Sequence, residues 1–225
     1  MLYGMDYYPK TVQLHNNLYV GGGGSYSISF SERCTVLKYN QWNDTWSKLP
    51  EYSCYSFGMS VINGHLTVVG GWDRDNHNVS KEVGVWEPSS QRWMQPYPPM
   101  ITPRFRPEVA TYSNYLLAAG GGDGYWKLTT VEVLDIRDGE QWLSVTQLPI
   151  PCSLKTSAIL HDNWYIITDS KRVLSVSLPE LCTQIVTKSA ATKTPARWQC
   201  LAETPLECTT AIAVSGSLLT VGGHL

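Results

Sequence analysis

Short apolar stretches that end in a pair of glycines recur along the chain about every 50 residues. The copies end at Gly21–Gly22, Gly70–Gly71, Gly120–Gly121 and Gly222–Gly223, and a degenerate copy ends at Asp169–Ser170. In the best-formed unit, Tyr55 to Met100, the pattern changes every few residues between alternating apolar positions and turn residues, as expected for short strands. A fixed period with short strands in every unit predicts an all-β propeller.

The unit from Tyr55 to Met100 shows the pattern most clearly. We expect its strands at residues 57–62, 65–69, 82–87 and 91–94. Asn63-Gly64 separates the first two, and this dipeptide favours a two-residue hairpin turn with positive φ at both positions. The unit therefore predicts one four-stranded blade.

The other units align with this one. Their third strands are expected at 36–39, 131–135 and 173–176, and a tryptophan follows each third strand. These tryptophans are Trp46, Trp93, Trp142 and Trp198, which we expect in the blade cores because a buried indole removes a large apolar area from water. The sequence predicts a single domain over 1–225, with units near 11–50, 55–100, 106–149 and 155–205 and a partial unit at 208–225.

The apolar strand that ends in Gly-Gly, the second apolar strand near Tyr39, Trp86 and Leu134, and the tryptophan that follows together resemble the Kelch repeat. The resemblance covers nearly the whole chain. It implies a Kelch-type β-propeller, in which blades surround a central channel and loops at one end bind proteins.

Two departures from the Kelch pattern stand out. In the fourth unit Asp169–Ser170 replaces the glycines, and the polar segment Thr183–Pro195 is expected to be an exposed, mobile insertion. The fifth unit has only its first two strands, whereas Kelch propellers ordinarily have six or seven blades. We therefore expect four blades plus a partial fifth in an open or incomplete ring. The alternative is a closed five-blade ring with Tyr3–Tyr8 as a strap.

Charge and hydropathy narrow the possible partners and location. The 17 basic and 19 acidic side chains give a net charge of −2 without a basic run, which argues against nucleic-acid binding. No segment has the long apolar stretch of a membrane span, and the first residues do not resemble an export signal, so we expect a cytoplasmic protein. Glycosylation triplets at Asn43 and Asn78 leave secretion as the alternative.

Candidate chemistry is sparse. The six cysteines lack zinc-ligand spacing, and His15, His65 and His161 fall beside turns expected at the end opposite the long loops. His77 and His224 alone do not make a metal site, and no Gly-rich stretch continues into a phosphate-binding helix. We expect no enzyme, cofactor or metal. Some Kelch-like propellers are copper oxidases, iron-dependent specifiers or sialic-acid epimerases, so a metal-dependent enzyme is the alternative.

Binding residues are expected in the loops between second and third strands and between blades, where Tyr, Trp and Arg are the residue types that dominate protein interfaces. The alternatives are that Trp72 and Trp126 cover the glycines and pack against neighbouring blades, and that Arg104 and Arg106 are ordinary solvated or blade-bridging groups. The candidate partner-binding residues are Tyr26, Phe30, Tyr55, Trp72, Asp73, Arg74, His77, Arg104, Arg106, Tyr125, Trp126 and Lys155.

The sequence therefore predicts a protein-interaction module that binds a protein or peptide on its loop face. The resemblance implies that such a propeller can be the substrate-recognition part of a cullin ubiquitin-ligase adaptor, with a BTB or F-box domain outside this sequence supplying the cullin contact. An actin-associated or general scaffold propeller is the alternative.

Overall fold

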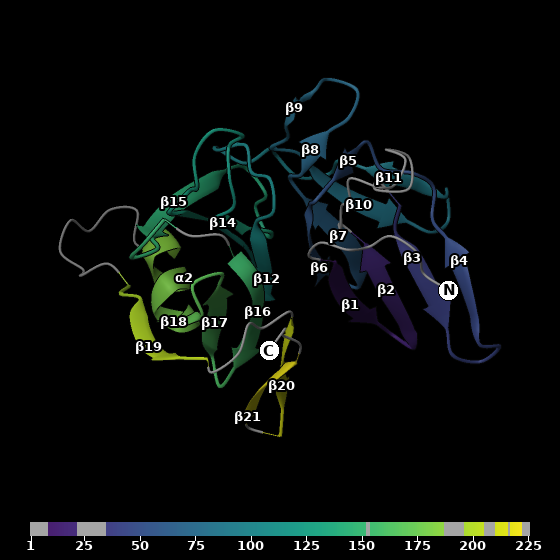
Figure 1. Ribbon diagram of the computed structural model, residues 1–225. Helices are drawn as coiled ribbons and strands as arrows, with labels where there is room; N and C mark the ends of the chain where they lie inside the picture. The colour runs from purple at the N-terminus through teal and green to yellow at the C-terminus, as the bar shows by residue number, and fades with distance from the viewer. Residues whose placement is uncertain are drawn as a thin grey trace.

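The computed structural model describes residues 9–21, 35–151, 154–186, 196–204, 210–215 and 217–221. In these residues the strands form four four-stranded sheets, a two-stranded hairpin and a small three-stranded sheet. Figure 1 shows the four large sheets following one another around a centre, as blades do. The prediction of an all-β propeller with four blades and part of a fifth is confirmed; the open ring stays a prediction.

Each of the first two blades is an antiparallel sheet, and its strands follow one another in chain order from the innermost to the outermost. The first blade contains β1 (Lys10–Leu14), β2 (Asn17–Gly21), β3 (Leu37–Asn40) and β4 (Thr45–Lys48). The second contains β6 (Gly58–Ile62), β7 (His65–Val69), β10 (Val83–Glu87) and β11 (Arg92–Met94).

The third and fourth blades repeat this order, and a hairpin begins the fifth. The third contains β12 (Glu108–Tyr112), β13 (Tyr115–Ala119), β14 (Thr130–Asp135) and β15 (Trp142–Gln147). The fourth contains β16 (Leu154–Leu160), β17 (Asn163–Thr168), β18 (Arg172–Ser177) and β19 (Gln199–Glu203). The hairpin is β20 (Thr210–Val214) with β21 (Ser217–Val221), and β20 packs beside β16.

The turn between β6 and β7 has the predicted geometry. Asn63 has φ 48° and Gly64 has φ 75°, so both turn positions occupy the left-handed region. This conformation matches the twist of a two-residue hairpin, which explains why Asn-Gly sets the register of Ile62 opposite His65.

The second strand of the third blade is apolar throughout because both of its faces are covered. Along β13, Leu116 and Ala118 join the core shared with the second blade. Leu117 and Ala119 join the core shared with the fourth blade. A strand between two blades needs no polar face, so the period-two alternation is lost there while the strand itself remains easy to recognise.

The repeated tryptophans lie as predicted in or next to the outer strands, but their burial differs. Trp142 is 2% exposed and Trp46 is 40% exposed, so the expectation that all of them are core residues is wrong for Trp46. The indole N–H groups of Trp93 and Trp142 donate to the carbonyls of Pro50 and Pro98 in the preceding inter-blade linker, both at 2.9 Å. The corresponding linker for Trp46 lies outside the described residues.

A helix occupies part of the segment that the sequence interpretation assigned to an exposed insertion. Helix α2 (Leu178–Val186) follows β18 directly, and Leu178, Leu181 and Cys182 are buried in the core between the third and fourth blades. These residues have the i, i+3, i+4 spacing of a helix face, and the Glu180 N–H donates to the Ser177 hydroxyl as at a helix start. Thr183 is therefore helical, and residues 187–195 lie outside the described part.

In the part of the chain that the structure describes, no helix has the length and hydrophobicity required to span a membrane.

Candidate functional site: the loop face

Loops from the second and third blades meet at one end of the molecule. We call this surface the loop face and define it as residues 51–56, 70–79, 104–107 and 120–128. Its framework is a small sheet of β5 (Cys54–Tyr55), β8 (Trp72–Asp73) and β9 (Asn78–Val79), drawn at the top of Figure 1. In the third blade, Gly122 forms the equivalent backbone bridges with Phe105 and Lys127.

The paired glycines bring these loops close to their neighbours. Gly71 has φ +106°, and a Cβ at this position would lie 2.7 Å from the Tyr55 carbonyl oxygen. Gly121 has φ +82°, and its Cβ would lie 2.6 Å from the Phe105 carbonyl oxygen. The paired glycines therefore have a steric role, because a side chain at either position would prevent the approach of the inter-blade linker.

A carboxylate holds each loop in a tight turn. Asp73 accepts hydrogen bonds from the backbone N–H groups of Asp75 and Asn76 at 2.9 and 3.1 Å. Asp123 accepts from the N–H groups of Tyr125 and Trp126 at 2.8 and 2.7 Å. The Trp126 and Tyr125 N–H groups stabilise the ionised form, so they hold the pKa of Asp123 below its usual value.

An aromatic layer joins the two loops. The Trp72 ring lies edge-on to the Phe105 ring with 6.5 Å between centroids, and the Arg106 guanidinium lies 4.7 Å from the centre of the same Phe105 ring. A Cβ on Gly124 would lie 3.6 Å from the Trp72 ring, so the second loop approaches this layer. Trp72 is half-buried here. Its packing against Phe105 agrees with the alternative in which Trp72 packs against a neighbouring blade.

Two aromatic side chains project beyond this layer. Tyr125 is 88% exposed and Trp126 is 77% exposed. Large exposed aromatic side chains next to each other are unusual on a surface that faces only water. Trp126 does not cover the glycines; the backbone of its turn is fixed by Asp123 while the rings stay accessible.

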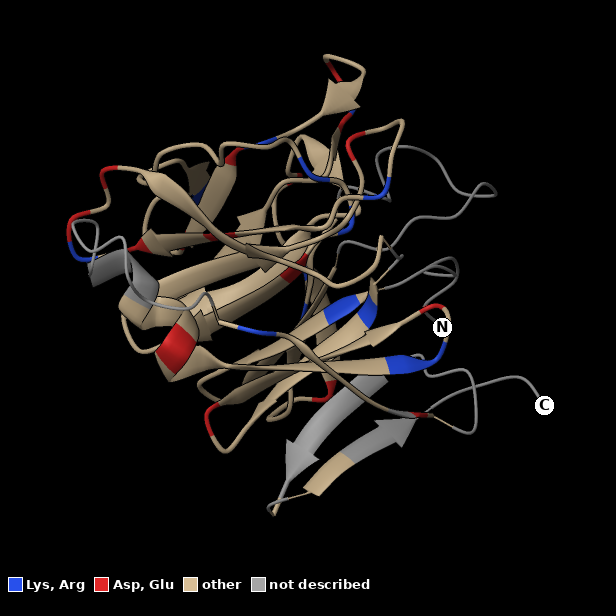
Figure 2. Cartoon of the chain, turned by 90° about the vertical axis from the view of Figure 1, so that its left-hand side faces the viewer, with Lys and Arg blue, Asp and Glu red and all other residues tan. Residues whose placement is uncertain are grey.

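Charged pairs of both signs surround the aromatic residues. Arg74 pairs with Glu51 at 3.0 Å and with Asp75 at 2.9 Å, and Lys127 pairs with Asp169 of the fourth blade at 3.1 Å. On the side drawn in Figure 2, acidic and basic residues are likewise interspersed. The loop face therefore differs from the surrounding surface more by its exposed aromatic side chains than by a net charge.

Arg104 does not belong to the binding surface. Its side chain is fully buried and pairs with buried Glu132 at 2.7 Å, and it also donates to the carbonyls of Gly120 and Thr130 at 2.8 and 2.9 Å. Burial lowers the pKa of this guanidinium, and the carboxylate of Glu132 opposes that shift. The expectation that Arg104 contacts a partner is wrong, because the residue bridges two blades from the interior.

The other predicted residues occupy different places. Tyr55 and Arg106 are half-buried on the loop face, and His77 is exposed at its edge. Lys155 lies in β16 and lines the central cavity, so its expected place in a loop is wrong. Tyr26 and Phe30 lie outside the described residues.

Sequence reasoning missed Phe105 and the role of Asp123. Phe105 takes in the third blade the place that Tyr55 has in the second, since each bridges the residue after the paired glycines. Aligning the inter-blade linkers with the same step as the glycines would have identified it. Asp123 follows its glycines as Asp73 follows Gly71, so the alignment also carried this signal.

The described residues contain no group of three or more His, Cys, Asp or Glu side chains placed to hold a metal ion.

Comparison with a solved structure places the fold in the β-propeller class. The structure described as "Structure of YjhT" matches with a TM-score of 0.74 at 13% sequence identity, over 96% of this chain and 72% of that chain. No protein-family model matches the chain.

Sequence comparison identifies the repeats more closely. Kelch repeat protein M-T9 of myxoma virus (strain Lausanne) is 27% identical over 150 residues, which is 66% of this chain and 28% of that protein. Human Kelch repeat and BTB domain-containing protein 12 is 29% identical over 168 residues, which is 64% of this chain and 26% of that protein. The chain is a β-propeller whose repeats are similar to those of Kelch-repeat proteins, and the matches span about a quarter of the length of these relatives.

Proposed function

We propose that this propeller is a protein-interaction module that captures a partner on its loop face. The observation that carries the proposal is the exposed pair Tyr125 and Trp126, held in a fixed turn by Asp123. Similarity to Kelch-repeat proteins supports an interaction role for the domain.

The geometry of the pair suits a binding hot spot. Tyr and Trp bury a large area while losing few rotatable bonds, so they contribute strongly when a partner covers them. The backbone hydrogen bonds to Asp123 restrict the turn before binding, which reduces the entropy lost on association. Trp72 and Phe105 pack against each other, and the loop that carries the pair approaches Trp72 at Gly124.

The charged pairs around the aromatic residues favour a segment with an apolar or aromatic anchor flanked by charges of both signs. Arg74 is only partly exposed and already faces Glu51 and Asp75. Lys127 faces Asp169. A strongly acidic partner would have to compete with these carboxylates, so we place the anchor contact on Tyr125 and Trp126.

We further propose that the propeller selects substrates for a cullin ubiquitin ligase. The support is the similarity to a human protein whose name includes a BTB domain, a relative much longer than this chain. An actin-associated or general scaffold role is the competing proposal, and both use the same loop face.

The first prediction tests the loop face. Replacing Tyr125 and Trp126 together with Ser should reduce co-purification of partner proteins with the tagged protein, expressed in its own cells, by about tenfold or more. Quantitative mass spectrometry of the purified complexes measures this loss. A cullin should remain bound in the variant, because its contact lies elsewhere.

Trp42→Ser is the matched control. Trp42 is 78% exposed in the turn between β3 and β4, which Figure 1 shows at the end opposite β8 and β9. This control should retain all partners. Equal losses in both variants would contradict the assignment of the loop face, whereas retained partners without a cullin would support the scaffold role over the ligase role.

A further inference from the structure

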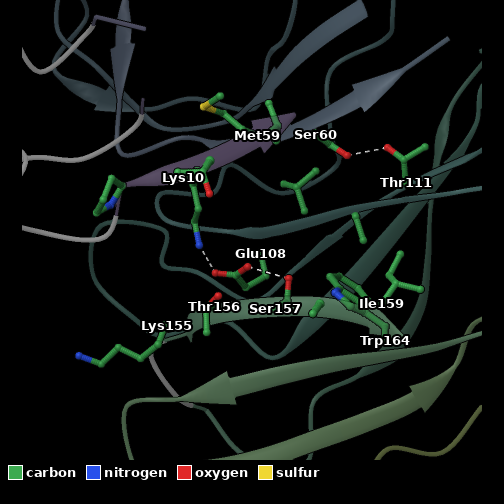
Figure 3. Close-up of a pocket in the computed structure, with 16 residues that line it drawn as sticks. Lys10, Met59, Ser60, Glu108, Thr111, Lys155, Thr156, Ser157, Ile159 and Trp164 are labelled. Atoms are coloured by element: carbon green, nitrogen blue, oxygen red, sulfur yellow. Dashed lines mark hydrogen bonds and ion pairs between the residues drawn. The ribbon is translucent and has the colours of Figure 1, made fainter. Parts of the chain in front are cut away.

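A cavity of about 290 Å³ lies between the innermost strands of the four blades (Figure 3). Its wall is formed by β1, β6, β12 and β16, together with Trp164 from β17. The volume is at the lower end of the range for small-molecule sites in proteins. Each wall strand belongs to a different blade, so the cavity exists only in the assembled propeller.

Two opposite charges meet within this cavity. The Lys10 ammonium from the first blade donates to Glu108 Oε1 in the third, and the Ser157 hydroxyl from the fourth blade donates to Glu108 Oε2 at 2.8 Å. Figure 3 shows these three side chains converging on one side of the cavity. The Lys10 and Glu108 side chains are 15% and 4% exposed, so the pair is largely removed from water.

The rest of the wall combines hydroxyl groups with apolar surface. The hydroxyls of Ser60 and Thr111 are 2.7 Å apart across the junction of β6 and β12. Ile159 belongs to the apolar part of the wall, and the buried Trp164 indole N–H has no hydrogen-bond partner among the described residues. Hydroxyl groups can both donate and accept, so this wall can satisfy ligand groups of either kind.

We propose that the cavity binds a small polyhydroxylated molecule without net charge, a monosaccharide or a polyol. The charges of Lys10 and Glu108 neutralise each other. A charged ligand would therefore bring an uncompensated charge into a poorly solvated site, which is unfavourable. Lys155 also lines the cavity, but its side chain extends away from the pair in Figure 3. Ligand hydroxyls would share the remaining N–H groups of Lys10 and the wall hydroxyls, and the C–H groups of the ligand would lie on the apolar part of the wall, which includes Ile159.

This site is separate from the loop face and does not rest on the proposed protein-binding function. None of the side chains that line the cavity is among the loop-face residues 51–56, 70–79, 104–107 and 120–128. Each activity can therefore be lost without the other.

Isothermal titration calorimetry of the purified chain tests the proposal with D-glucose, myo-inositol, glucuronate and glucosamine as probes. At least one neutral probe should bind with Kd of about 1 mM or tighter. Glucuronate and glucosamine have the glucose ring with one charge added, and each should bind about tenfold more weakly or not at all. Absence of binding by both neutral probes would overturn the proposal, as would tighter binding of the charged probes.

Variants of the cavity wall provide a second test of the proposal. Glu108→Gln leaves the cavity with a net positive charge and should shift preference from glucose toward glucuronate by about tenfold. Glu140→Gln is the matched control in an exposed turn and should leave preference unchanged. Ala158→Leu, which fills the cavity without removing a polar group, should abolish binding. Folded variants, checked by circular dichroism, that bind all probes as the unmodified chain does would place binding elsewhere and overturn the proposal.

Discussion

At the residue scale, tryptophans at the same position of the repeat differ in burial and in their contacts. Trp142 and Trp93 reach the carbonyls of Pro98 and Pro50, and Trp93 also packs against Tyr52 and Trp86 with centroid distances of 5.2 and 5.4 Å. Trp46 has a tilted contact with Tyr39 at 5.1 Å and remains 40% exposed. Repeat position alone therefore does not determine how much a tryptophan stabilises its blade.

Alanine substitutions should rank these tryptophans by burial. Trp142→Ala should lower the free energy of unfolding by about 3–5 kcal/mol through lost burial and a cavity. Trp46→Ala should cost about 1 kcal/mol, because much of its indole is already in water. Trp93→Ala should fall between them. Urea denaturation monitored by circular dichroism measures the order; equal costs for Trp46 and Trp142 would contradict it.

Asp123 links loop conformation to pH. Its pKa is lowered in the folded protein, so the stabilisation it provides is complete above its ordinary value and is lost as pH falls through the lowered value. The turn that carries Tyr125 and Trp126 should therefore loosen below about pH 4. NMR of the Trp126 indole should show this change in the unmodified protein.

Asp123→Asn separates the charge from the hydrogen bonds of this turn. The asparagine oxygen can still accept from the two backbone N–H groups, so the turn should persist but lose its pH response. Asp123→Ala should loosen the turn at every pH. A pH response that survives in Asp123→Asn would assign the effect to another group.

At the scale of elements, the paired glycines determine how a blade meets the next linker. The Gly71 and Gly121 backbones lie against Tyr55 and Phe105, and backbone hydrogen bonds continue this contact, as from the Gly71 N–H to the Arg104 carbonyl at 2.8 Å. Buried Arg104 and Glu132 reinforce the same junction. The loop face is thus built on a joint between blades, which positions its aromatic residues.

Two glycine substitutions should distinguish close approach from backbone conformation. Gly71→Ala should lower the free energy of unfolding by more than about 3 kcal/mol, since it adds a clash with a backbone oxygen to an unfavourable φ. Gly64→Ala, with φ +75° and open space around its Cβ, should cost about 1 kcal/mol. Thermal unfolding of both variants gives the comparison. Similar losses would mean that the approach to Tyr55 has little energetic weight.

At the scale of the whole molecule, contacts across the centre join blades that are distant in the chain. Lys10 and Glu108 connect the first blade to the third and pass over the second, while the neighbouring inner strands β1, β6, β12 and β16 pack side by side. Such contacts make the blades depend on one another, in addition to the apolar cores between neighbours.

A double-mutant cycle should show this dependence. Lys10→Met leaves Glu108 buried without its cation and should lower the free energy of unfolding by about 3 kcal/mol. Adding Glu108→Met should recover most of that loss, because two apolar side chains replace the buried pair. Denaturant unfolding of the four proteins measures the coupling. Additive effects would show that the two charges do not interact in solution.

The repeated local signals were sufficient to predict the blades. Asn63-Gly64 predicted a hairpin through positive φ, and the apolar stretch ending at Gly70–Gly71 predicted the strand beside it, because both depend on residues adjacent in sequence. Helix α2 was missed because its short apolar face becomes stable only against the third and fourth blades. The repeat predicted where loops occur, and with them the exposed positions of Tyr125 and Trp126.

The sequence by itself determined the all-β class, the four-stranded unit and the Kelch pattern, since these follow from short-range periodicity and turn chemistry. Only the tertiary structure decided which polar residues face the interior. Arg104 was expected on the surface but meets Glu132 inside, and Lys10, Glu108 and Ser157 come together from three blades. Such partners lie far apart along the chain, and their pairing depends on how the blades curve around the centre, which no local pattern encodes.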